Sequence, residues 1–132
     1  MHIVPWDPDL HLALIEGWMD ARGIEHVKGA RDLYPRTGFV VDGALCGFMF
    51  RTDAPGVAYL DSFVGDPSRG RQDVEAAMVA LIGSLQQEAR ARGVRLLCGS
   101  SPVPSIINAC KQLGWTADAC TLTHVSVSLE SE

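Results

Sequence analysis

The fold of this chain follows from one continuous stretch, Val57-Ala58-Tyr59-Leu60-Asp61-Ser62-Phe63-Val64-Gly65-Asp66-Pro67-Ser68-Arg69-Gly70-Arg71-Gln72, and from the pattern that comes after it. Residues 57–64 form an apolar, β-prone run that predicts a strand, and residues 65–72 predict a loop. From about Asp73 to Arg92, apolar residues recur at steps of three and four, which predicts a long helix. The apolar stripe of this helix comprises Val74, Ala77, Met78, Leu81, Leu85 and Ala89.

The loop at residues 65–72 carries two arginines and two glycines and leads into the open start of that helix. The first backbone N–H groups of a helix have no partner within the helix, and the helix dipole adds partial positive charge there. A strand, a basic loop and a helix start therefore predict an anion-binding site. A plain strand–helix connection with a solvated loop is the structural alternative.

The segments before this stretch predict a strand, a helix and an antiparallel meander. Residues 2–6 predict a short strand, and Asp7-Pro8 predicts a helix start because Asp caps free N–H groups and Pro fits the first helical position. Pro35 limits any second helix to about residues 28–33. Residues 38–64 predict three antiparallel strands, joined first by a two-residue hairpin at Asp42-Gly43. The pattern that carries the first helix up to Gly23 is Leu10, Leu14, Trp18 and Ala21.

The segments after the long helix predict a parallel strand and a further helix. Gly93 ends the long helix, and residues 94–98 predict a buried strand joined to the central strand through a helix, hence parallel to it. The next helix opens near Ser101-Pro102 and ends at Gly114, and two more β-prone runs lie between residues 115 and 129. The apolar side of this helix comprises Ile106, Ile107, Cys110 and Leu113. No internal repeat or linker interrupts the chain, so we expect a single domain over residues 1–132.

Composition excludes several classes of protein. The chain of 132 residues is 47% hydrophobic, which predicts a globular domain. Its net charge of −5 argues against broad binding to nucleic-acid backbones. No apolar run approaches the roughly 20 residues that span a bilayer, and the start lacks the features of a signal peptide. The four cysteines show no metal-ligand spacing and predict reduced core thiols in a cytoplasmic protein, not a disulfide framework or a zinc site: Cys46, Cys98, Cys110 and Cys120.

Three places in the chain resemble the GNAT (Gcn5-related N-acetyltransferase) superfamily, and the order of predicted elements agrees with it over nearly the whole chain. The strand, loop and helix of residues 57–92 look like the acetyl-CoA motif of that superfamily. The segment Ile106-Ile107-Asn108-Ala109-Cys110-Lys111-Gln112-Leu113-Gly114-Trp115 is similar to its helix ending in Leu-Gly-aromatic. Leu33-Tyr34-Pro35 with Gly38, residues 47–53 and Thr123-His124 resemble small GNAT-like proteins of bacteriophages and prophages. The resemblance implies an α+β fold with a mixed central sheet flanked by helices.

The chain departs from the superfamily pattern at two places. The pyrophosphate loop of the superfamily is Arg/Gln-x-x-Gly-x-Gly/Ala, whereas this chain reads Arg69-Gly70-Arg71-Gln72-Asp73-Val74. Side chains in place of the later glycines obstruct close approach of a phosphate, and Asp73 adds negative charge, while Arg69 and Arg71 offset part of this. Many members carry a Tyr as proton donor to the CoA thiolate, and here Cys110 occupies that position.

The resemblance implies an N-acetyltransferase in which an amine attacks the thioester of acetyl-CoA directly. Backbone groups of Phe63 and Val64 would bind the pantetheine arm, and N–H groups of residues 69–74 would bind the pyrophosphate. The expected base is Asp61, on the central strand, where a carboxylate on a mostly apolar face is costly unless it serves a site or pairs with an arginine. His124 is the second candidate base, and Cys110 the candidate acid. Alternation predicts that Asp61 shares a face with Tyr59 and Phe63.

Two other functions stay open at this point. One is a GNAT-fold protein without catalysis that serves as a binding or virion-associated protein, and the other binds a different phosphorylated ligand. The acceptor of the transferase would be a small-molecule or peptide amine, with no membrane partner. Similar proteins are often homodimers, and a phage-encoded protein would act in the host cytoplasm.

Overall fold

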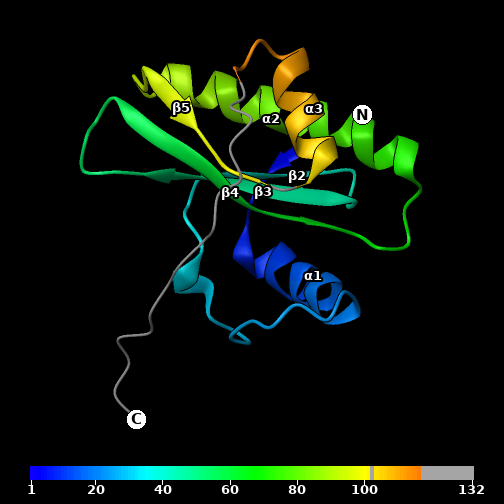
Figure 1. Cartoon of the computed structure of the whole chain (residues 1–132). Coiled ribbons are helices and arrows are strands. Elements are labelled where there is room, and N and C mark those ends of the chain that lie inside the picture. Colours follow the sequence, from blue (N-terminus) through cyan, green and yellow to red (C-terminus); the bar gives the residue numbers. More distant parts are fainter. Residues whose placement is uncertain (102, 117–132) are drawn as a thin grey trace.

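The computed structural model of the chain describes residues 1–101 and 103–116, and Figure 1 shows a sheet with helices on both faces. The sheet has five strands in the order β1-β2-β3-β4-β5. The strands are β1 (Ile3–Pro5), β2 (Gly38–Val41), β3 (Leu45–Arg51), β4 (Val57–Gly65) and β5 (Leu96–Cys98). The helices are α1 (Pro8–Ala21), a 3₁₀ turn η1 (Arg31–Leu33), α2 (Arg71–Ala91) and α3 (Pro104–Gln112). Helix α1 covers one face, and α2 and α3 cover the other (Figure 1).

Strand β4 pairs as the sequence predicts. It lies antiparallel to β3 and parallel to β5, so the mixed α+β sheet and the βαβ connection through α2 are confirmed. The parallel register begins at Val57 with Leu96 and ends at Tyr59 with Cys98. The prediction of a buried strand over residues 94–98 was wrong in length and burial: β5 has three residues, and Leu96 and Cys98 are exposed because β5 lies at the edge of the described sheet. Strand β4 continues to Gly65, so residues 60–65 have no pairing with β5.

The turn between β2 and β3 confirms the predicted hairpin but is one residue longer. Asp42 and Gly43 adopt positive φ values of 49° and 61°, as a primed turn requires. Val41 pairs with Leu45, so Ala44 is an extra residue between the strands. The Ala44 carbonyl accepts a hydrogen bond from the N–H of Asp66 at 2.7 Å. This contact ties the hairpin to the loop after β4.

Glycines end the described helices in the predicted manner. Gly23, Gly93 and Gly114 follow the last turns of α1, α2 and α3 with φ values of 70°, 78° and 89°. After α2, the N–H of Gly93 donates to the carbonyl of Arg90, and the N–H of Val94 donates to that of Ala89. This pair of bonds is the Schellman motif, which satisfies carbonyls that the helix itself leaves free.

Three predictions about helices need correction. Helix α2 begins at Arg71 rather than Asp73, and only a 3₁₀ turn forms within residues 28–33. In α1, Leu10 is 73% exposed and Leu14 is 39% exposed, although the sequence pattern placed them on the apolar stripe. The buried residues of α1 are Ile15, Trp18 and Met19, which join the core on the sheet, and Glu16, which accepts the N–H of Gly29. Because α1 is apolar around most of its circumference, the spacing of its leucines did not identify the buried side.

The sheet separates two cores. The core under α2 holds buried residues from β3, β4 and α2, among them Met49, Leu60 and Leu81. The core under α1 holds Trp6, Ile15 and Phe48 with their neighbours. In the part of the chain that the structure describes, every helix is too short or too polar to cross a membrane.

Candidate functional site

Pairing between β4 and β5 ends at Tyr59 and Cys98, and we call the edge of β4 beyond this point the opening. The resemblance to the GNAT superfamily implies a ligand along this edge. Beyond Tyr59 and Cys98 the two strands share no pairing, while β4 runs on to the loop at residues 66–70. Backbone groups of β4 that face β5 in this region therefore lack strand partners among the described residues. Such groups are available to a bound molecule that lies along β4.

A bulge in β4 lies in the part of the strand that pairs with β3 but not with β5. Cys46 pairs with Val64 and Phe48 pairs with Asp61, so Ser62 and Phe63 together face Gly47 of β3. Ser62 has a φ of 59°, a left-handed conformation that is uncommon for a serine. Its N–H donates to Asp61 Oδ1 at 2.7 Å.

The bulge corrects the predicted orientation of β4. Before it, Ala58 and Leu60 face α2, so Tyr59 and Asp61 face the side of α1. After it, Phe63 packs with the α2 core and Val64 with the α1 core. Asp61 therefore shares a face with Tyr59, as predicted, but not with Phe63, because the extra residue reverses the alternation. The exposed Asp61 has no ion pair among the described residues, so the predicted alternative of an arginine partner is not observed.

The start of α2 presents free N–H groups. Its N-cap is Gly70, which has no side chain to accept hydrogen bonds from the first turn. The N–H of Arg69 donates to the carbonyl of Asp66, and that of Val74 to the carbonyl of Gly70. Within the predicted anion site of residues 69–74, this leaves the N–H groups of residues 70–73 without a partner among the described residues. Asp73 lies in the first turn and adds a carboxylate beside them.

Arg69 and Arg71 of the loop contact a backbone carbonyl and a carboxylate of the protein. Arg69 donates to the Asp42 carbonyl at 3.1 Å, and Arg71 pairs with Glu75 at 3.0 Å while remaining 90% exposed. Sequence reasoning missed Arg22, which follows α1 and whose Nε donates to the carbonyl of Gly65 at 2.8 Å. No local pattern marks Arg22, since only the packing of α1 on the sheet brings it to the end of β4.

Asp66 organises the loop and is ionised. The backbone N–H of Ser68 and then its hydroxyl donate to the Asp66 carboxylate, and Arg69 and Arg22 add weaker attraction, so the pKa of Asp66 lies below its ordinary value. Hydrogen bonds to the charged form favour that form. Arg69 and Arg22 therefore lie near a local negative charge.

The remaining predicted site residues are Cys110 and His124. Cys110 is half-buried on α3 against the α2 core, and burial raises the pKa of its thiol. His124 lies outside the described residues. Cys46, Cys98 and Cys110 are free thiols, and burial raises the pKa of Cys46 to about 12. Within residues 1–101 and 103–116, no group of His, Cys, Asp and Glu has the arrangement of a metal site.

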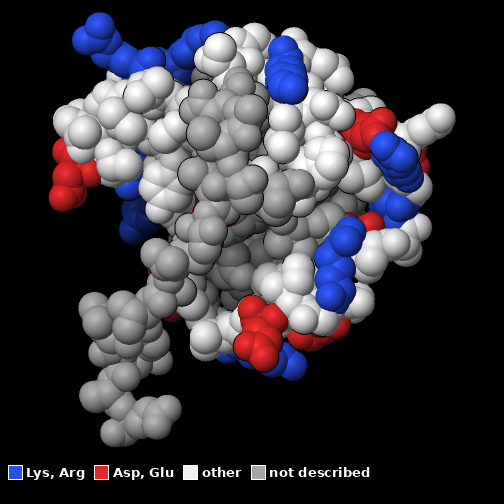
Figure 2. Space-filling model, viewed as in Figure 1, with Lys and Arg blue, Asp and Glu red and all other residues white. Residues whose placement is uncertain are grey.

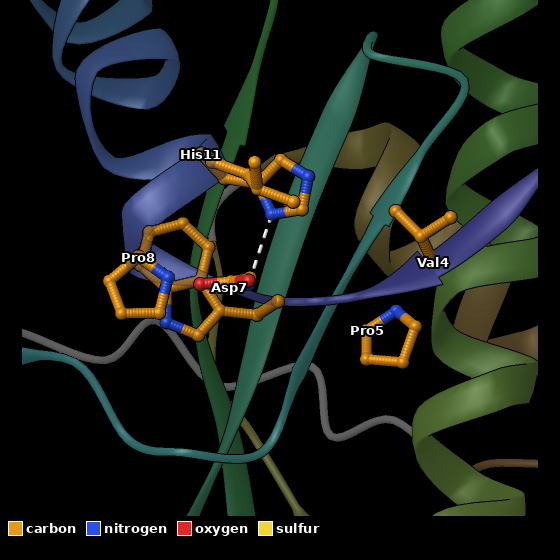
Figure 3. Close-up of a pocket in the computed structure, with 7 residues that line it drawn as sticks. Val4, Pro5, Asp7, Pro8 and His11 are labelled. Carbon is orange, nitrogen blue, oxygen red and sulfur yellow. Dashed lines mark hydrogen bonds between the residues drawn. The ribbon is translucent and has the colours of Figure 1, made fainter.

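An open hollow of about 590 Å³ lies away from this opening (Figure 3). It is formed by β1 and the start of α1, with Val4, Pro5 and His11 among its lining residues. His11 Nδ1 accepts the N–H of Asp7 at 3.0 Å, so this polar atom serves the helix start. Figure 2 shows basic and acidic side chains interspersed over the viewed face, without one broad basic field.

Similarity to known proteins is found in structure and not in sequence. No family model and no curated protein matches the chain. A mutant protein of Thermus thermophilus superposes with a TM-score of 0.70 at 16% identity over 98% of this chain and 100% of that chain. An acetyltransferase of Streptococcus pneumoniae, described as a GNAT family protein, superposes with a TM-score of 0.60 at 13% identity over 98% and 100%. The chain has the GNAT fold.

A further structure with this fold carries ligands. N-acetylglutamate synthase from Neisseria gonorrhoeae, complexed with coenzyme A and N-acetyl-glutamate, superposes with a TM-score of 0.58 at 15% identity. The match covers 84% of this chain and 28% of that chain. At these identities the likeness establishes the GNAT fold and leaves the activity of this chain to its own residues.

The GNAT-like motif at the end of α3 has a structural explanation. Gly114 takes the left-handed conformation after the helix, and the N–H of Trp115 donates to the carbonyl of Cys110. Trp115 Nε1 donates to Gln86 Oε1 of α2 at 2.8 Å. Leu-Gly-aromatic in this GNAT fold therefore ends α3 and fastens it to α2.

Proposed function

We propose that the protein is an N-acetyltransferase that uses acetyl-CoA. The observation that carries the proposal is the opening between β4 and β5, with the uncapped start of α2 at its end, in a chain with the GNAT fold. An extended strand edge and a cluster of free N–H groups suit a ligand with a hydrogen-bonding arm and a pyrophosphate.

Acetyl-CoA would use both parts of this opening. The N–H groups of residues 70–73 would bind the pyrophosphate, with Arg69 and Arg71 contributing positive charge. Backbone groups of Phe63 and Val64 would bind the pantetheine arm. The side chain of Gln72 and the carboxylate of Asp73 oppose this binding, since both occupy the first turn.

In the proposed acetyl transfer, the side chains of the protein act as general base and general acid. The nitrogen of the acceptor amine attacks the thioester carbonyl, a C–N bond forms, the C–S bond breaks, and CoA leaves as a thiolate. The ammonium proton of the acceptor passes to Asp61 or His124, directly or through water. Cys110 would return a proton to the thiolate, although its raised pKa makes the thiol a weaker acid than an ordinary cysteine.

The alternative function rests on the departures in the loop. If Gln72, Asp73 and Val74 prevent phosphate binding, the protein is a GNAT-fold binding protein without catalysis, such as a virion-associated one. A different phosphorylated ligand at the same loop is the remaining alternative.

Calorimetric titration of the full chain with acetyl-CoA tests the proposal. Arg69→Ala with Arg71→Ala should weaken binding, and more so at low salt, because exposed charges are screened by salt. Arg90→Ala with Arg92→Ala is the matched control at the far end of α2, where Arg92 pairs with Glu88 as Arg71 pairs with Glu75. This control should leave the affinity unchanged.

A glycine variant separates the enzyme from its alternative. Gln72→Gly with Val74→Gly should strengthen binding of acetyl-CoA if the two side chains obstruct the phosphate, at a cost of up to about 1 kcal/mol of helix stability per glycine. Absence of binding in both the wild type and this variant would exclude the transferase and leave the binding protein.

A further inference from the structure

Two aromatic rings lie stacked beside the opening, on the side of the sheet that α1 covers. Phe50 of β3 and Tyr59 of β4 are register partners, with ring centroids 5.2 Å apart and planes inclined by 9°. Phe50 is partly buried against the α1 core, whereas Tyr59 is 38% exposed. The Tyr59 ring therefore rests on a supported ring and keeps part of its surface open to solvent.

A carboxylate lies next to this surface. Asp61 follows Tyr59 on the same face of β4, opposite Phe48. Its Oδ1 accepts the N–H of Ser62, and it makes no ion pair with any described residue. Same-face neighbours on a strand lie roughly 7 Å apart, so the carboxylate and the tyrosine ring can contact one small molecule together.

The position of Asp61 relates this surface to the proposed reaction. Pairing with β5 ends at Tyr59, so Asp61 stands just inside the opening, while Tyr59 and Phe50 stand just outside it. In the proposed reaction Asp61 takes the proton of the acceptor, and an ammonium group bound there can direct its substituent over the two rings. A carboxylate and an aromatic face both attract a cation.

We infer that Asp61, Tyr59 and Phe50 form the acceptor site, and that the acceptor is a small primary amine carrying an aromatic ring on a short linker. This inference rests on the proposed function for the direction of transfer, whereas the binding itself does not depend on acetyl-CoA. Asp61 recognises the ammonium group, and Tyr59 selects an aromatic substituent over an aliphatic one of the same size through ring stacking.

The inference is tested by nuclear magnetic resonance titration of the full chain, without acetyl-CoA, using 2-phenylethylamine and 2-cyclohexylethylamine. These probes share charge and length and differ in aromaticity. The wild type should bind 2-phenylethylamine about fivefold more tightly. Tyr59→Leu should abolish this preference, and Tyr59→Phe should retain it because the ring remains. Asp61→Asn should weaken both amines about fivefold, and Asp53→Asn, an exposed carboxylate in the turn between β3 and β4, should weaken neither.

Each outcome decides the inference. Equal affinity of the wild type for the two amines, no binding of either, or an undiminished preference in Tyr59→Leu overturns it. Selective amine binding without any binding of acetyl-CoA keeps this inference and rejects the transferase. Binding of acetyl-CoA without selective amine binding does the reverse.

Discussion

At the scale of single residues, environment separates side chains of the same chemical type. Asp61 is exposed beside an aromatic pair, whereas Asp66 is held ionised by hydrogen bonds within its own loop. We propose a ligand contact only for the first, whereas the second holds Ser68 and Arg69 within the loop. The same contrast holds for the cysteines, of which Cys46 is buried and Cys98 is exposed.

This contrast predicts a pattern of thiol reactivity. Iodoacetamide at mildly alkaline pH should modify Cys98 in the folded protein and leave Cys46 unmodified, because the thiolate is the reactive form and burial raises the pKa of Cys46 to about 12. Mass spectrometry of peptides from the labelled protein measures both. In denaturant without reductant, all four cysteines should react. Labelling of Cys46 as fast as Cys98 in the folded state would contradict the buried position.

At the scale of elements, capping residues near in sequence explain where the helices begin and end. Asp7 caps α1, since its side chain accepts the N–H of Asp9, and glycines end α1, α2 and α3. The interior of α1 contains one residue that these rules do not explain. Gly17 lies mid-helix and exposed, and a Cβ built on it would meet nothing within 4 Å.

Gly17→Ala should therefore stabilise the protein. Alanine restricts the unfolded chain and favours the helix, so the free energy of unfolding should rise by about 0.5–1 kcal/mol. Gly47→Ala is the contrasting variant, because its Cβ would lie 2.5 Å from the ring of Phe63 and should destabilise the bulge region. Urea denaturation followed by circular dichroism measures both changes. A lower stability of Gly17→Ala would show that the glycine has a role that the packing of α1 does not reveal.

At the scale of the whole molecule, the proposed function predicts stabilisation by acetyl-CoA. A ligand at about 100 times its dissociation constant adds about 2.7 kcal/mol to the free energy of unfolding. The Tm should then rise by several degrees, measured by thermal shift of the full chain. Adenosine diphosphate serves as the control ligand. Equal stabilisation by adenosine diphosphate and acetyl-CoA would favour a site for another phosphorylated ligand over one that also holds a pantetheine arm.

Local interactions along the chain set the elements and their order, and these could be predicted from the sequence. The turn at Asp42-Gly43 and the glycines that end the helices follow from interactions between residues close in the chain. Such interactions are visible as spacing and residue type. The resemblance to the GNAT superfamily, drawn from residues 57–92 and the end of α3, agrees with the fold.

Packing between distant segments set which residues meet at the site, and no local pattern predicted it. The buried side of α1 depends on the sheet it packs against, and the position of Arg22 beside Gly65 depends on that packing. The bulge at Ser62 arises from pairing between β3 and β4, and it turns Phe63 away from Asp61. Tyr59 meets Phe50 through the same register. These contacts join residues far apart in the chain, so their geometry is fixed by how strands and helices pack against one another.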